Sequence, residues 1–131
     1  MTTDDLWLAH AEAGHPRGPF GHREHLRLTW LVLDREPSVD AAAERVSATI
    51  RRLAEAHGRP QRYNRTLSEA WVRIVAHCRA ASPAEPFPGM VARYPWLLDK
   101  RLLRRHYSSR VLASPQARRE WISPDLEPIP A

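Results

Sequence analysis

The sequence has few or none of several features that would define a class of protein. Its 131 residues include one cysteine, Cys78, which excludes an internal disulfide and any metal or iron–sulfur site built from several cysteines. It has no apolar run long enough to span a bilayer, so we expect no contact with a membrane. Alternation of apolar and polar residues, which indicates strands, is not found over four or more positions. These absences favour an all-α protein.

Lysine is also nearly missing. Arginine supplies almost all of the 20 basic residues, Lys100 is the only lysine, and the formal net charge is +5. A basic balance favours non-specific association with nucleic acid but does not define a fold. The first residues, MTTDDLWLAHAEAG, are acidic at the start and lack the apolar region of a secretory signal, so we expect a cytoplasmic protein.

Twelve prolines divide the chain, and the spacing of apolar residues between them predicts the helices. The expected helices and shorter helical pieces are 4–13, 22–36, one that follows an N-cap at Ser38, one that begins at Thr66, and then 90–93, 96–106 and 115–121. The TLSE stretch predicts a capping box between Thr66 and Glu69. Ser114 followed by Pro115 predicts another helix start.

These elements predict one all-α domain over residues 1–131, a small helical bundle. Its extended, proline-rich segment 122–131 is expected to pack on the body, with Leu126 and Ile129 as apolar anchors. The same segment is a candidate surface for a homodimer.

Two histidines stand out in the stretch PFGHREHLRLTWLVL. On a helical wheel His22 and His25 fall on the apolar side, near Thr29, where leucines would be expected. They are one turn apart, so their imidazoles project from neighbouring points of one face. Neutral imidazole is the commonest protein ligand for a transition metal, which makes a metal site one interpretation. The alternative is a pair of buried histidines that bind a carbonyl or carboxylate and have no further role.

A useful metal site needs a third ligand. Glu69 is the candidate that we assign, with His77, Asp99 and His106 as others. One carboxylate and two histidines suit a divalent iron, zinc, copper or manganese centre with open positions. Glu69 also has a structural explanation, because it can close the capping box and pair with Arg73 four residues later.

The expected active site is a cavity between the second and fourth long helices that holds a small-molecule substrate. Tyr63 and Asn64, in the loop before the fourth helix, and His106, near the end of a later helix, are the candidate catalytic residues. A neutral histidine pair can also act without a metal, as general acid and base.

The C-terminal third contains a basic and aromatic cluster, and its members are Arg104, Arg105, Tyr107, Arg110, Arg118, Arg119 and Trp121. One interpretation is a clamp for a phosphate or carboxylate. The other, which we favour, is a solvated face whose arginine stems pack on aromatic rings.

Two other functions are left open. A basic nucleic-acid-binding or regulatory protein is less favoured, because the arginines are dispersed and no helix-turn-helix pattern is found. A non-catalytic helical protein that binds a larger partner is the third alternative.

Three stretches of the chain resemble a small bacterial family of uncharacterised proteins. FGHREHLRLTWLVL is similar to its F-x-H-x-x-H-L-R-x-x-W pattern, YNRTLSEAW to Y-(H/N)-x-T-x-(T/S)-x-x-W, and RHYSSRVLASPQARREWISPDL to a pattern that ends A-R-x-x-(F/W)-x-x-P-D. The resemblance covers most of the chain from Phe20 onward. It implies that His22 and His25 belong to a shared pattern. Asn64 stands where many relatives carry histidine, and the family has no settled activity.

Overall fold

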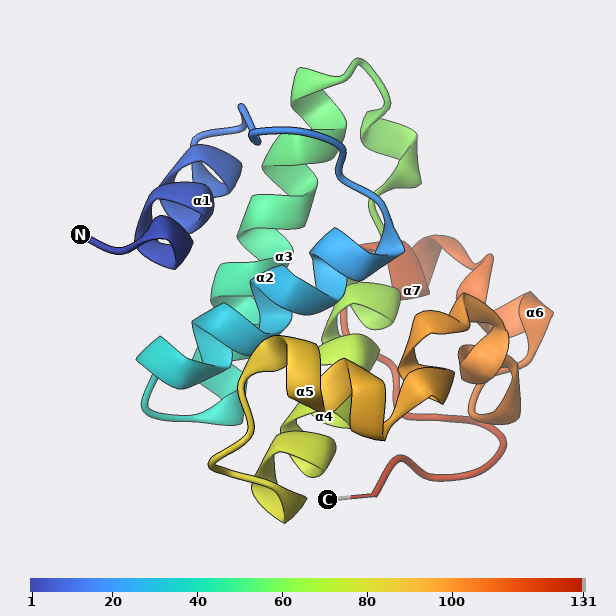
Figure 1. The fold of residues 1–131 in the computed structure, drawn as a ribbon. Coiled ribbons are helices and arrows are strands. Elements are labelled where there is room, and N and C mark those ends of the chain that lie inside the picture. Colours follow the sequence, from blue (N-terminus) through green and yellow to red (C-terminus); the bar gives the residue numbers. More distant parts are fainter. Residues whose placement is uncertain (131) are drawn as a thin grey trace.

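The computed structural model describes residues 1–130, which form helices joined by short loops (Figure 1). The elements are α1 (Thr3–Glu12), α2 (His22–Arg35), α3 (Val39–Ala56), η1 (Pro60–Arg62), α4 (Arg65–Ala81), α5 (Phe87–Arg93), η2 (Pro95–Leu98), η3 (Lys100–Arg105), α6 (Ser109–Leu112) and α7 (Pro115–Arg119), where η marks a 3₁₀ helix. The described residues contain no strand, which confirms the all-α prediction. Within them, no helix combines the length and the apolar character that a membrane crossing requires.

Two of the predicted helix starts are confirmed by their capping bonds. The Ser38 hydroxyl accepts a hydrogen bond from the Ala41 amide at 3.1 Å, which starts α3. The Ser114 hydroxyl accepts from the Ala117 amide at 3.1 Å and starts α7. Both bonds satisfy an amide that has no partner inside the helix.

The predicted capping box at Thr66 is wrong. Helix α4 begins one residue earlier because Asn64 is its N-cap, and Asn64 Oδ1 accepts from the Leu67 amide at 2.9 Å. The Thr66 hydroxyl instead donates to the Glu120 carbonyl at 2.6 Å and accepts from the Ile122 amide at 3.0 Å. Thr66 therefore joins α4 to the C-terminal segment, a partner that local sequence does not reveal.

The piece predicted over residues 96–106 is two 3₁₀ turns and not one helix. Asp99 follows the last residue of η2 and is also the N-cap of η3, because its carboxylate accepts a hydrogen bond from the Arg101 amide at 3.0 Å. Pro95 occupies the first position of η2. A new cap in the middle of the piece prevents a continuous α-helix.

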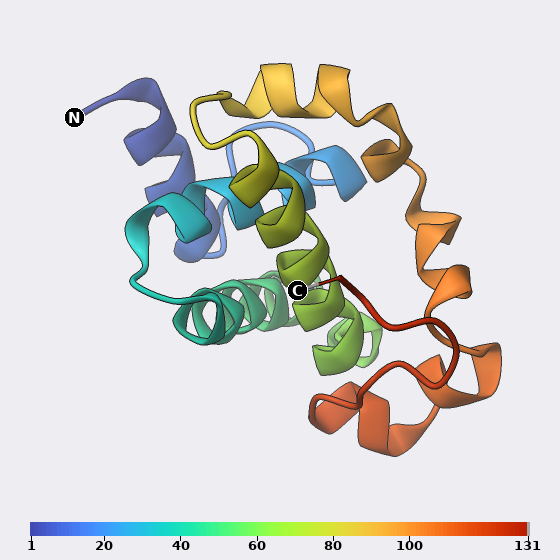
Figure 2. The ribbon, with the colours of Figure 1, turned by 90° about the horizontal axis from the view of Figure 1, so that it is seen from below.

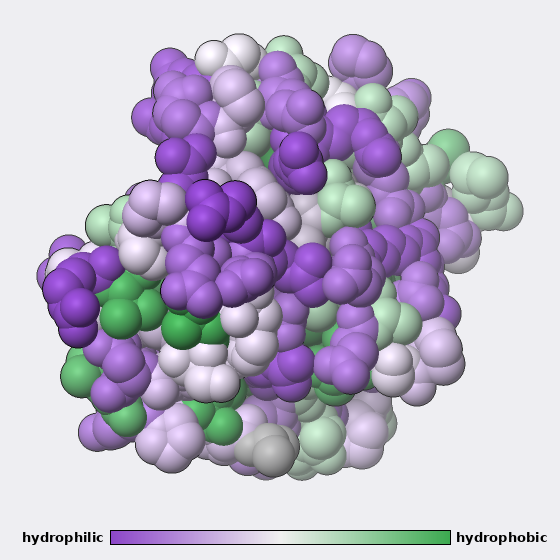
Figure 3. All heavy atoms as spheres, turned by 180° about the vertical axis from the view of Figure 1, so that it is seen from behind, coloured by the Kyte–Doolittle hydropathy of each residue, from purple (hydrophilic) through white to green (hydrophobic). Residues whose placement is uncertain are grey.

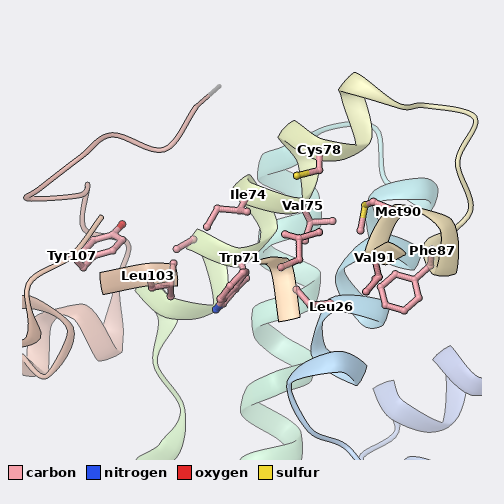
Figure 4. Packing of buried hydrophobic residues seen from close by; sticks show 12 residues of the cluster. Leu26, Trp71, Ile74, Val75, Cys78, Phe87, Met90, Val91, Leu103 and Tyr107 are labelled. Atoms are coloured by element: carbon pink, nitrogen blue, oxygen red, sulfur yellow. The ribbon is translucent and has the colours of Figure 1, made fainter. Parts of the chain in front are cut away.

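Helix α4 lies at the centre of the molecule and packs against α2, α3 and α7. On one side its Val72 joins a core cluster with α1, α2 and α3. On the other side Trp71 is the largest member of a second cluster, between Leu26 of α2, Leu103 of η3 and residues of α5 (Figure 4).

Polar side chains cover most of the face opposite to that of Figure 1 and leave separate apolar patches (Figure 3).

Glu69 is the one carboxylate among the buried polar side chains of the described residues. It lies on α4 between Arg65 and Arg73, whose guanidinium nitrogens approach its two oxygens to 2.8 and 2.7 Å. Arg65 also pairs with Glu44 at 2.9 Å, and Arg73 with Asp40 at 3.1 Å, so both arginines reach across to α3. This network, which we call the Glu69 network, fastens α4 to α3.

The C-terminal segment crosses the body and returns along α4 (Figure 2). The amides of Leu126 and Glu127 donate to the carbonyls of His106 and Arg105 at 3.0 and 3.2 Å. Ile129 packs on the core cluster around Trp71, as predicted. Leu126 is 52% exposed, so the prediction that its side chain is an anchor is wrong, because its backbone makes the attachment. Ala131 of the predicted range 122–131 lies outside the described residues.

Replacement of Glu69 by glutamine is expected to lower the free energy of unfolding by about 3 kcal/mol, because two arginines would lose a buried counter-charge. Glu44→Gln removes a carboxylate from the same network at a side chain that is 73% exposed. It should lower the free energy of unfolding by less than about 1 kcal/mol. Urea unfolding of both variants at pH 7 measures the difference, and equal effects would contradict the structural role of the Glu69 network.

Candidate active-site cavity

A cavity of about 830 Å³ lies where α2 begins. The loop between α1 and α2, the end of α3, η1 and the start of α4 surround it, and these segments lie near one another in Figure 1. Its polar and charged lining residues are His22, His25, His57, Arg59, Arg62, Asn64, Ser68 and Lys100. The predicted cavity between α2 and α4 is therefore present, with a third wall from α3. Its volume is within the range of small-molecule sites.

His22 has a fixed tautomer. Its Nε2 lies 2.8 Å from the carbonyl oxygen of Leu97 in η2. A carbonyl oxygen only accepts, so Nε2 carries the proton and the lone pair of the neutral ring is on Nδ1. The ring also contacts Trp71 edge to face, with 4.6 Å between ring centroids. Burial lowers the pKa of His22 below its usual value, although the bond to Leu97 opposes this shift.

His25 borders the same cavity one turn later. Its Nε2 is buried and has no hydrogen-bond partner in the structure. Burial lowers the pKa of His25 to about 4, and the neighbouring His22 acts in the same direction. The ring is therefore neutral at pH 7. A buried polar atom without a partner costs roughly 1–3 kcal/mol, so its retention in this position calls for an explanation.

The structure does not bring the third predicted metal ligand to these histidines. The Glu69 carboxylate is bound by Arg65 and Arg73 and does not line the cavity. Asp99, another candidate, is bound by Arg101. Across residues 1–130, no group of three or more His, Cys, Asp or Glu side chains is arranged to hold a metal ion. A metal at this site would thus have His22 and His25 as its protein ligands.

The three residues predicted as catalytic lie in three places. Asn64 lines the cavity, but both ends of its amide are engaged, with Oδ1 on Leu67 and Nδ2 donating to the Leu112 carbonyl at 2.8 Å. Tyr63 lines a different cavity, beside α3. His106 is buried, and its Nδ1 donates to the Glu127 carbonyl at 2.8 Å, which helps to hold the C-terminal segment. Only Asn64 of the three is beside the histidine pair.

Cys78 and the aromatic members of the C-terminal cluster have structural surroundings. Cys78 is buried in the core, and burial raises the pKa of its thiol to about 11, so the thiol is protonated at pH 7. The Tyr107 hydroxyl donates to the Ile122 carbonyl at 2.6 Å, and burial raises its pKa. The Arg73 guanidinium lies 4.9 Å from the ring centroid of Trp121. The arginine beside Trp121 thus comes from α4 and not from the C-terminal cluster, and the predicted packing of the cluster's own arginine stems on aromatic rings stays a prediction.

Several lining residues were not predicted as part of the site. His57 ends α3, with its Nδ1 2.8 Å from the Leu53 carbonyl, and Ser68 faces the cavity from α4. Arg59, Arg62 and Lys100 complete the rim. The sequence offered one signal for Lys100, which is its status as the only lysine. It offered none for the others, because they come to the cavity from separate segments.

The pKa of His25 predicts a specific loss of stability in acid. Because the folded pKa is about 4 and the unfolded value is near 6.5, the unfolded chain binds the proton more tightly. The stability from the neutral ring is complete above pH 6.5 and is lost as the pH falls toward 4. Between pH 7 and pH 5 the protein should lose about 2 kcal/mol through His25.

His25→Gln removes this titration, and urea unfolding of wild type and variant at both pH values measures it. The difference between their free energies of unfolding should change by about 2 kcal/mol from pH 7 to pH 5. A His25→Gln variant with the wild-type pH dependence would contradict the buried, neutral state of the His25 ring.

Comparison of the chain with known proteins gives no assignment. No family model matches it, and neither does any curated protein or solved structure. The resemblance of its three motifs to the uncharacterised bacterial family stays a prediction, and the functional argument rests on the residues of the cavity.

Proposed function

We propose that the chain is a small enzyme and that the cavity at the start of α2 is its active site for a small-molecule substrate. The observation that carries the proposal is the oriented His22, whose basic nitrogen is defined by a backbone bond, next to His25, whose Nε2 is buried and has no hydrogen-bond partner. Paired titratable groups with perturbed pKa values in a cavity are typical of catalytic sites.

His22 is the group that we assign to proton transfer. With its Nε2 proton held by the Leu97 carbonyl, the ring accepts a proton at Nδ1. In that step the bond between the substrate atom and its hydrogen breaks, the electron pair stays on the substrate, and an N–H bond forms on His22. His25 is neutral at pH 7, so it does not repel the positive charge that His22 acquires.

A metal-dependent form of the enzyme would use the same histidine pair, without the third protein ligand that the sequence predicted. Histidines that bind metals usually donate their second N–H to a carbonyl or carboxylate, as His22 does to Leu97. His22 and His25 would then be the two protein ligands, and substrate or water would complete the coordination of an iron, zinc, copper or manganese ion. The two forms share the cavity and the histidine pair and differ in what His22 binds.

A structural explanation of His22 has to be separated from this proposal. Its bond to Leu97, which lies 75 residues later in the chain, joins α2 to η2 and would by itself stabilise the fold. A variant at this position therefore needs a readout of catalysis as well as one of stability.

Conversion of small molecules by purified protein tests the proposal. A small-molecule extract incubated with wild type and with His22→Gln, and then analysed by mass spectrometry, reports every compound that is consumed. We expect at least one compound to be consumed by wild type, and about 100-fold more slowly by His22→Gln, since loss of a general base has effects of this size. Arg51→Gln, at an exposed position that lines a different cavity, should behave as wild type. If no compound is consumed, or if His22→Gln is as fast as wild type while folded, the proposal is wrong.

Elemental analysis of protein made without a histidine tag decides between the two forms. Stoichiometric iron, zinc, copper or manganese in wild type, and its loss in His25→Ala, would support the metal-dependent form. Conversion by wild type that contains no such metal would support the acid–base form.

A further inference from the structure

The rim of the cavity carries positive charge and no negative charge. Its lining includes Arg59, Arg62 and Lys100, and it includes neither aspartate nor glutamate. Two other cavities differ in this respect, because Glu44 and Glu55 line one of them, beside α3, and Asp4 of α1 and Glu24 of α2 line the other. In a chain with 15 acidic residues, the histidine cavity is thus distinguished by the sign of its charge.

The three cations of the rim are not neutralised by the protein. Many arginines of the chain pair with carboxylates, but Arg59, Arg62 and Lys100 form no ion pair with any group in residues 1–130. Asp99 is adjacent to Lys100 in sequence, yet its two oxygens bind Arg101 at 3.0 and 3.2 Å. Uncompensated charges at the mouth of a cavity with low-dielectric walls attract ions of the opposite sign.

Apolar side chains form much of the remaining lining, beside the histidine pair. They are the partly buried Phe20, Ile50 and Leu67 and the buried Leu53 and Trp71. A ligand that fills the cavity therefore contacts hydrocarbon and the neutral histidine pair in its interior and cations at its opening. Such a division selects molecules with an apolar body and one charged group.

The bond between His22 and Leu97 connects this rim to the histidine pair. Leu97 belongs to η2, and Lys100 begins η3 three residues later. The ammonium of Lys100 is close enough to act on His22 electrostatically. An anion held by Lys100 is consequently placed beside the basic group of the site.

We infer that the cavity binds an organic anion, in which a carboxylate or phosphate group contacts Lys100, Arg59 and Arg62 and an apolar body contacts Phe20, Ile50 and Leu67. Binding of the anion does not depend on the proposed function. Only the further statement that this anion is the enzyme's substrate rests on it. Lysine and arginine both bind these groups, and lysine does so as a compact point charge.

Calorimetry with four probes of similar shape tests the charge preference. The probes are phenyl phosphate, phenylacetate, phenylacetamide and 2-phenylethylamine. We expect both anions to bind in the millimolar range or tighter, the neutral amide at least about tenfold more weakly, and the amine without measurable heat. Added salt should lower the affinity for both anions and leave the affinity for the amide unchanged. A stronger response to phosphate than to carboxylate, or the reverse, identifies which anion the site prefers.

Variants of the rim test the residues. Lys100→Gln and Arg62→Gln should each lower the affinity for phenyl phosphate about five- to tenfold. Lys100→Arg keeps the charge and should not lower this affinity. Arg51→Gln is the matched control, because it removes an exposed arginine that lines a different cavity and pairs with Glu55. Its affinity for phenyl phosphate should equal that of wild type. Equal binding of the amine and the anions, absence of binding by both anions, or unchanged affinity in both Gln variants would overturn the inference.

The outcome is separable from that of the proposed function. If phenyl phosphate binds in a way that depends on Lys100, but no compound is consumed faster by wild type than by His22→Gln, the anion site is supported and the proposed enzymatic function is wrong. Consumption of a neutral or cationic compound through His22 would uphold the enzyme and overturn the anion inference.

Discussion

A carboxylate buried in the middle of a small helical protein has to be paired, and the pairing of Glu69 with Arg65 and Arg73 organises much of this fold. Helix α4 is buried on several sides, so water cannot solvate the buried carboxylate of Glu69. The two arginines extend the pairing to Asp40 and Glu44, which fixes how α3 lies on α4. The walls of the histidine cavity come from α2, α3 and α4, and their relative placement depends on this contact.

The site has a different organisation, because backbone carbonyls orient its side chains. His22 binds the Leu97 carbonyl and His57 lies near the Leu53 carbonyl. Such bonds define which nitrogen is basic without adding a second charged group. Because burial lowers the pKa of both His22 and His25, this pair is neutral at pH 7, while Arg59, Arg62 and Lys100 carry the positive charge of the rim. The proposed chemistry and the inferred ligand both use that separation.

The sequence predicted what depends on neighbouring residues. The spacing of apolar residues predicted the long helices. A serine just before a helical pattern predicted the caps at Ser38 and Ser114. It failed where a distant partner competes for a side chain, since Thr66 binds Glu120 and Ile122 instead of capping α4. For Glu69 the local alternative holds, because its carboxylate pairs with Arg73, as the spacing predicted, and with Arg65 instead of joining the histidines. The histidine pair itself was predictable from its place on the apolar face. The cationic rim was not, because Arg59 and Arg62 come from the start and the end of the η1 turn and Lys100 comes from η3.

The attachment of the C-terminal segment has a consequence for how the molecule meets its neighbours. An extended segment on a protein surface is a template on which another chain can add as a β-strand, if its amides are free. Here Pro124, Pro128 and Pro130 have no amide hydrogen, and the amides of Leu126 and Glu127 are already bound to the body. The segment is thus poor in donors for strand addition, and its exposed path gives little opportunity for ordered self-association into fibres.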